Sequence, residues 1–207
     1  MTIGALGYLA YSYAIFAFSV VIDPMTPAHI AILGLAAWAV LLMAFRMKDA
    51  TLDGLQDVQL PRRTTSGFLL VVAALFLLFW LGQIAGAIAS GALPPSISDL
   101  RLPTSPVYAL DLAFALPLLA LAGVWLLRTD RRGTAAAIAA LGFTVLMGAS
   151  VLAIFVVDAA AGAAIEVPPL VIFGAVTGTA ATLLAAGLRS SRAIAGRPGL
   201  AWTAPRS

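Results

Sequence analysis

Residues 67–89 read GFLLVVAALFLLFWLGQIAGAIA, a stretch without a charged side chain. A helix that crosses the hydrocarbon core of a bilayer needs about 20 consecutive residues that are mostly apolar. This stretch meets that requirement, with Gln83 as a polar residue inside it. It therefore predicts a membrane-spanning helix, from which the rest of the chain can be interpreted outward.

Similar apolar runs lie on both sides, at residues 3–22, 27–45, 106–127, 134–157 and 168–188. Thr26-Pro27 and Ser105-Pro106 each place an N-cap residue before a proline at the first helical position, which is typical of a helix start. The first run lacks the basic n-region and cleavage pattern of a signal peptide, so we expect it to be retained. The sequence predicts an all-α bundle of about six spanning helices, a single transmembrane domain over residues 1–188, and a flexible basic tail at 189–207.

The composition agrees with lipid as the main solvent. Of the 207 residues, 62% are hydrophobic and 10% are charged, and the mean hydropathy is +1.03. A soluble domain carries about 25% charged residues, so this chain has too little charge to cover a surface in water. The chain has no cysteine, which excludes disulfides, thiolate catalysis and iron–sulfur ligation, and its one histidine, His29, excludes a multi-histidine metal cage. With no phosphate loop, nucleophile elbow or HExxH motif, we predict no catalytic, cofactor or metal residues.

The basic residues predict the orientation. Of the 12 Lys and Arg residues, 11 fall in residues 46–66, 128–133 and 189–207, and Arg101 is the exception. Since cytoplasmic loops carry an excess of Lys and Arg, both termini are expected inside. The high sequence pI, near 9.8, is then explained by basic residues on the cytoplasmic side of the membrane, and we expect no nucleic-acid partner.

Asp111 is the most informative residue, because it lies inside an apolar run. Five residues after Pro106, it sits about 7–8 Å along the helix axis. A carboxylate at that depth is costly in lipid, so it should face the bundle interior. It is either an ion or proton site or a structural anchor that accepts hydrogen bonds from a neighbouring helix. Pro117 cannot donate to the carbonyl of Ala113, which predicts a kink whose freed carbonyl can help to coordinate a cation, although kinks are also ordinary in membrane helices.

Other polar residues fall toward the same outer side of the predicted bundle. His29 lies near the start of the second run, Tyr8 and Tyr11 lie in the first, and Gln83 lies in the third. Together with Asp111 they predict an outward-facing polar cavity. The alternative is that these side chains only contact water or lipid headgroups.

Small and aromatic residues suggest how the helices pack. Gly82 with Gly86, and Gly174 with Gly178, form GxxxG patterns that let helix backbones approach closely. We expect them to pack helices inside this bundle, with homodimerisation as the weaker alternative. Trp80 lies inside a run and is interpreted as a packing residue or interfacial anchor.

Two segments carry a family resemblance: residues 104–114 read TSPVYALDLAF before Pro117, and residues 4–13 read GALGYLAYSY. They are similar to a group of uncharacterised bacterial multi-pass membrane proteins that share a T-x-P-V-x-x-L-D-L-A-F segment and a tyrosine helix. The resemblance covers most of the membrane region, implies that Asp111 and Pro117 belong to the group's pattern, and supplies no activity. Further hydrophobic sequence precedes the tyrosine helix in that group, so this chain is expected to be a short member or to lack upstream helices.

Three classes of function remain. We favour a non-catalytic structural or accessory component of a bacterial plasma membrane, with the lipid bilayer and a membrane protein or a second copy as partners. A small ion or solute transporter, with a hydrated cavity reaching Asp111, is the alternative. A membrane enzyme acting on a lipid-type substrate is the third class and needs converging groups such as Asp111 and His29. The scarcity of charged residues in most of the runs argues against a dedicated proton relay.

Overall fold

The computed structural model describes residues 2–19, 26–46, 58–98, 102, 105–130, 132–162, 164 and 167–195. Within these residues every regular element is helical, which confirms the predicted all-α fold. The elements are α1 (Thr2–Ser19), α2 (Thr26–Arg46), α4 (Arg62–Ser90), α5 (Pro95–Ser98), α6 (Pro106–Leu110), the π-helical turn η1 (Asp111–Ala115), α7 (Leu116–Leu127), α8 (Gly133–Ala160) and α9 (Val167–Ala195). α6, η1 and α7 follow one another without a break and form one span.

Four of the described helical segments are long and apolar enough to cross a membrane: Arg62–Ser90, Pro106–Leu127, Gly133–Ala160 and Val167–Arg189. Helices α1 and α2 contribute shorter apolar stretches, Thr2–Phe18 and Ala31–Val40. The predicted count of about six spans is therefore only roughly matched. Four such helices are the pattern of a multi-pass membrane protein.

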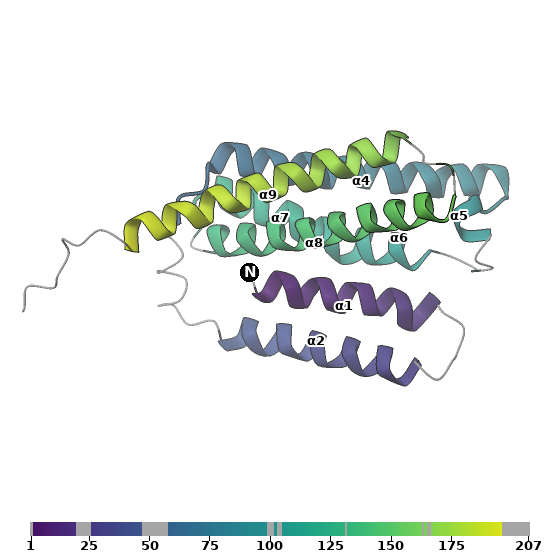
Figure 1. The fold of residues 1–207 in the computed structure, drawn as a ribbon, viewed down its shortest axis with the longest axis horizontal. Helices are drawn as coiled ribbons and strands as arrows, with labels where there is room; N and C mark the ends of the chain where they lie inside the picture. Colours follow the sequence, from purple (N-terminus) through teal and green to yellow (C-terminus); the bar gives the residue numbers. More distant parts are fainter. Residues whose placement is uncertain are drawn as a thin grey trace, which may run out of the picture.

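The long helices run roughly parallel to one another and alternate in direction, so that α1 begins and α9 ends at the same end of the bundle (Figure 1). α1 and α2 form a hairpin, which we call the N-terminal hairpin. α4, the α6–α7 span, α8 and α9 form a second unit, the four-helix core, in which α4 packs on α7 and α7 and α9 pack on α8. The hairpin joins this core through α1, which packs on α8 and α6.

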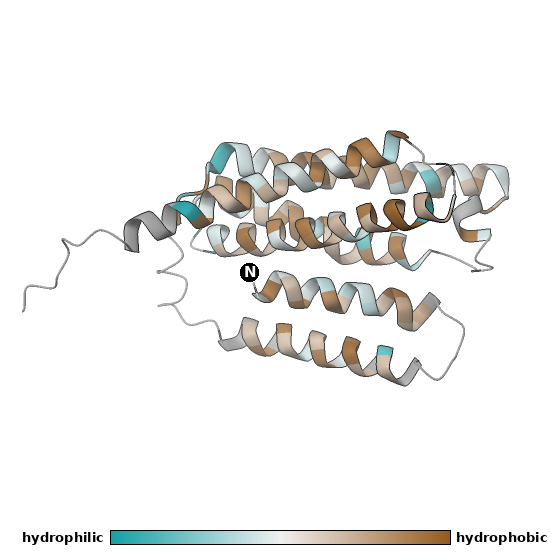
Figure 2. Ribbon diagram, in the orientation of Figure 1, coloured by the Kyte–Doolittle hydropathy of each residue, from teal (hydrophilic) through white to brown (hydrophobic). Residues whose placement is uncertain are grey.

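Apolar side chains divide between the inside of the core and its outer surface. Leu69, Ala137, Leu141 and Ala180 are fully buried where the core helices meet. Large apolar side chains such as those of Leu78 and Val156 are exposed, and hydrophobic residues recur along all the long helices (Figure 2). A helix that is hydrophobic on all sides is suited to lipid, because exposing such an apolar surface to water is energetically unfavourable.

Local sequence signals explain several helix ends. Ser105 accepts a hydrogen bond from the backbone N–H of Tyr108, and Pro106 occupies the first turn, as predicted. α4 ends at Gly91, whose left-handed φ of 67° lets its N–H bond to the Ala87 carbonyl at 2.9 Å.

The last helix is longer than the sequence predicted. α9 continues to Ala195, so the first part of the expected flexible tail is helical. No glycine or proline interrupts residues 188–195, whereas Gly196 and Pro198 follow directly and disfavour continuation of the helix. Residues 196–207 lie outside the described part of the chain.

Candidate functional site

Asp111 lies in the bundle interior, as predicted, and its side chain is only 9% exposed. The Tyr11 hydroxyl of α1 donates a hydrogen bond to Oδ1 at 2.7 Å. The Trp80 indole Nε1–H of α4 donates to Oδ2, also at 2.7 Å. One carboxyl group therefore joins three helices, the third being its own.

The two donors are held in place by aromatic packing. The Tyr11 residue is 7% exposed, and its ring packs in a T-shaped arrangement with that of Phe143 from α8, with ring centroids 5.6 Å apart. The Trp80 ring lies against Tyr108 of α6, with centroids 4.5 Å apart. Because Tyr108 is one helical turn before Asp111, the span that carries the acceptor also supports the indole donor. These contacts orient both donors toward the carboxyl group.

The helix widens where Asp111 lies. Residues Asp111–Ala115 form a π-helical turn, in which the N–H of Leu116 bonds to the carbonyl of Asp111. Pro117 follows, and in a regular α-helix its ring would clash with the carbonyl of Ala113. The kink expected at Pro117 stays a prediction, and the irregularity that the structure shows is the π-helical turn just before the proline.

The hydrogen-bonding state of Asp111 limits its chemistry. Both carboxyl oxygens accept a hydrogen bond, and both donors are neutral side chains. Among the described residues, no cluster of three or more His, Cys, Asp or Glu side chains is arranged to hold a metal ion. The arrangement is that of an inter-helix anchor, because burial of a polar group is tolerated when it is fully hydrogen-bonded.

Tyr8 does not meet Asp111 but makes a parallel contact one turn earlier on α1. Its hydroxyl is hydrogen-bonded to the Ser150 hydroxyl of α8. Since Ser150 uses its own proton to donate to the Leu146 carbonyl at 3.0 Å, Tyr8 is the donor. Two phenols on one face of α1 thus bind the hairpin to the core.

His29 belongs to a different environment. Its ring stacks on Phe16 with centroids 5.5 Å apart, and Tyr13 lies 5.8 Å away by the same measure. Both aromatic residues belong to α1, so His29 contributes to packing within the N-terminal hairpin. The ring contacts of His29 differ from the contacts of Asp111, and a cavity that joins the two side chains stays a prediction.

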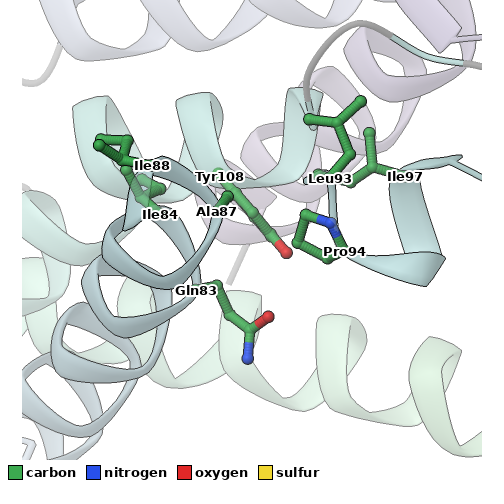
Figure 3. A pocket seen from close by; sticks show the side chains of 8 residues that line it. All are labelled: Gln83, Ile84, Ala87, Ile88, Leu93, Pro94, Ile97 and Tyr108. Atoms are coloured by element: carbon green, nitrogen blue, oxygen red, sulfur yellow. The ribbon is translucent and has the colours of Figure 1, made fainter. Parts of the chain in front are cut away.

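Gln83 lines a separate cavity of about 150 Å³ at the end of α4. Its other lining residues are mainly apolar, and they come from α4, residues 93–97 and Tyr108, as Figure 3 shows: Ile84, Ala87, Ile88, Leu93, Pro94 and Ile97. Asp111 is not part of this lining. The five predicted cavity residues are therefore divided among separate environments, and only Tyr11 contacts Asp111.

The glycines of the two GxxxG patterns lie away from helix contacts. A Cβ at Gly82, Gly86, Gly174 or Gly178 would meet nothing within 4 Å. These glycines make no such close approach to the described helices, and their expected packing role stays a prediction. Close approaches occur at other glycines: a Cβ at Gly4 would meet the Ala139 carbonyl oxygen, and one at Gly148 would meet Thr177.

Trp80 is the site residue whose role the sequence did not predict. It was interpreted as a packing or interfacial residue, but its indole N–H is one of the two donors to Asp111. A buried tryptophan usually places its N–H on an acceptor, and Asp111 is an acceptor at depth in another run. A tryptophan donor in one apolar run and an aspartate acceptor in another therefore indicated a possible hydrogen bond. The sequence does not show which helices are neighbours, so it did not predict this bond.

Comparisons with models of protein families, with curated proteins and with solved structures find no match to this chain.

Proposed function

We propose that this chain is a non-catalytic structural or accessory component of a bacterial plasma membrane, with both ends on the cytoplasmic side. In this role the bundle provides a stable membrane unit, and Asp111 is an anchor within it. The distribution of basic residues supports the orientation. The resemblance of residues 104–114 to bacterial membrane proteins supports the location.

The observation that carries the proposal is the pairing of Asp111. Each carboxyl oxygen accepts a hydrogen bond from a neutral donor, Tyr11 of α1 or Trp80 of α4, which is how a structural anchor uses a buried acceptor. Each donor belongs to a different helix, so the pairing serves assembly of the bundle. Polar side chains often join membrane helices in this way, because lipid offers no alternative partner.

The enzyme class finds little support. It required Asp111 to converge with a second catalytic group, for which His29 was the choice. The His29 ring instead packs on Phe16 and Tyr13.

One observation favours transport as the second candidate. The π-helical turn at Asp111–Ala115 lies directly before Pro117, and such wide turns often occur at functional sites. Rearrangement of this turn would turn Asp111 away from its two donors and free its oxygens for a cation. Transport therefore requires a second state of the span.

Thermal stability of the purified protein separates the two candidates. Wild type and Asp111→Asn would be scanned over pH and over Na⁺, K⁺ and Mg²⁺, because a ligand that binds only the folded state raises its melting temperature. The structural role predicts that no cation stabilises wild type selectively and that the variant is less stable under every condition.

Asp130→Asn is the matched control, since Asp130 is an exposed acid in the turn after α7. A cation-dependent rise in melting temperature that is present in wild type and in Asp130→Asn but lost in Asp111→Asn would overturn the structural role. It would place a transport site at Asp111.

A further inference from the structure

Five arginines lie at the end of the bundle where α1 begins and α9 ends. Arg62 and Arg63 open α4, Arg128 and Arg132 belong to the turn between α7 and α8, and Arg189 lies near the end of α9. The side chains of all five are exposed. Hydrophilic residues are visible at this end of α4 and α9 (Figure 2).

Close contacts between the core helices bring these arginines to one level. A Cβ at Gly123 of α7 would lie 3.2 Å from the Ser66 carbonyl oxygen of α4. Arg62 is one turn before Ser66 and Arg128 is just over one turn after Gly123, so the antiparallel helices end side by side.

The same reasoning places α9 and α8. A Cβ at Gly187 would lie 2.6 Å from Cδ2 of Leu60, which precedes α4 by two residues, and Arg189 follows Gly187 by two. A Cβ at Gly133 would lie 2.7 Å from the backbone of Trp125, which holds the start of α8, and Arg132 beside it, against the end of α7. Three structural elements therefore contribute to one basic surface.

Among the described residues, Asp130 is the acid within this surface, and its side chain already makes a hydrogen bond within the turn. Its Oδ1 accepts a hydrogen bond from the backbone N–H of Arg132 at 2.8 Å. Arginine guanidinium groups form forked hydrogen bonds that match phosphate oxygens. In a chain with membrane-spanning helices, a cluster at helix ends meets the headgroup layer, where anionic lipids present phosphates.

We propose that Arg62, Arg63, Arg128, Arg132 and Arg189 form a binding surface for the headgroups of anionic phospholipids in the leaflet at this end of the bundle. The proposal rests on membrane insertion and is independent of the role of Asp111. Each arginine near an anionic membrane surface raises the affinity for that surface by about fivefold. A surface shared by three elements also ties these helix ends together through the lipid.

The test uses the full chain in neutral detergent, titrated with phosphatidylglycerol or with phosphatidylcholine. Bound lipid is measured by native mass spectrometry and by the shift in melting temperature. We expect phosphatidylglycerol to bind and stabilise wild type in preference to phosphatidylcholine. Replacing Arg62 and Arg63 together by Gln should weaken phosphatidylglycerol binding at least tenfold, with the melting temperature in phosphatidylcholine unchanged.

Two controls separate a specific surface from net charge. The double replacement by Lys keeps the charge but loses the forked geometry, so its affinity should lie between wild type and the Gln variant. Arg206→Gln removes a charge from the C-terminal region outside the described residues and should change the affinity less than twofold.

Several outcomes would overturn the proposal. An equal loss per charge in Arg206→Gln would show attraction by net charge alone. Stabilisation of wild type by inorganic phosphate to the same extent would show a free-anion site. A loss of stability of the Gln variant in every lipid would show that the arginines pair with acids of this chain instead of with lipid. Such acids are present in residues 47–57, outside the described part of the chain, as Asp49, Asp53 and Asp57.

Discussion

The four-helix core and the N-terminal hairpin are held in different ways. Among the described side chains, the main buried apolar cluster comes from Val58, Leu60, α4, α7, α8 and α9, and none of it comes from α1 or α2. The hairpin is fastened to the core by polar contacts on one face of α1: Tyr11 with Asp111, and Tyr8 with Ser150. The backbone of α1 also approaches that of α8 closely at Gly4, where a Cβ would meet the Ala139 carbonyl oxygen.

In lipid, apolar packing and hydrogen bonding stabilise helices to different extents. Apolar packing gains little hydrophobic free energy there, because lipid tails are as apolar as leucine, so dense cores depend on fit. Hydrogen bonds between membrane helices contribute about 0.6 kcal/mol on average and up to about 1.7 kcal/mol. The stability of the core should therefore depend mainly on the shape of its side chains. The attachment of the hairpin should depend mainly on hydrogen-bond donors and acceptors.

The largest expected effect is that of Asp111→Ala. Removal of the acceptor leaves the Tyr11 hydroxyl and the Trp80 indole N–H without a partner, and an unsatisfied buried group costs about 1–3 kcal/mol. We expect the free energy of unfolding to fall by about 2–4 kcal/mol. Hydrogen exchange should increase more in α1 and α2 than in α8 and α9.

Asp158→Ala is the control for this variant, since it removes an acid that is exposed near the end of α8. Equal acceleration of exchange in the hairpin and in the core of Asp111→Ala would contradict the distinction between the two regions.

The packing of the four-helix core can be tested by adding a methyl group where two helices are in close contact. In Gly148→Ala the new methyl group meets the Thr177 side chain, whose Cβ lies 3.1 Å from the Cβ position. Overpacking of this kind costs about 1–2 kcal/mol, which chemical unfolding in mixed micelles can measure. Gly142→Ala on the same helix should cost much less, because a Cβ there meets nothing within 4 Å. Similar losses for the two variants would show that the α8–α9 contact is loose.

Tyr11→Phe should have a smaller effect that is confined to the hairpin. It keeps the ring against Phe143 and removes one donor to Asp111, so the expected loss in the free energy of unfolding is about 0.6–1.7 kcal/mol. Tyr13→Phe is matched to it, because the Tyr13 ring contacts Phe16 and His29. If Tyr13→Phe destabilised the protein as much as Tyr11→Phe, the bond to Asp111 would have no special role.

The smallest effect is expected for Gly82→Ala with Gly86→Ala. A Cβ at either position meets nothing, so the free energy of unfolding should change by less than about 0.5 kcal/mol. Light scattering of the detergent-solubilised protein would report the mass of the particle. A lower mass in the double variant than in wild type would show that this face of α4 contacts a second copy.

The sequence predicted the parts of the fold that depend on local pattern. The apolar runs located the long helices, and Ser105-Pro106 marked the start of the fourth run. Asp111 was expected inside the bundle because charge is costly in lipid, and its low exposure confirms this.

The partners of Asp111 were harder to predict, because they depend on which helices are neighbours. Tyr11, His29 and Gln83 all appeared to belong to one outer side, yet Tyr11 alone contacts the carboxyl group. The sequence shows how deep a residue lies along a helix but not which helix face opposes it. GxxxG patterns have the same limit: Gly82 and Gly86 are available for packing, and their face meets no described helix.

The most direct test of the anchor is a double-mutant cycle between Tyr11→Phe and Asp111→Ala, measured as the free energy of unfolding. If Asp111 joins the hairpin to the core, Tyr11→Phe costs about 1 kcal/mol in wild type. In the Asp111→Ala background it is neutral or stabilising, because it removes a hydroxyl that has lost its acceptor. The same cost in both backgrounds would contradict the anchor, because the two side chains would then contribute to stability independently.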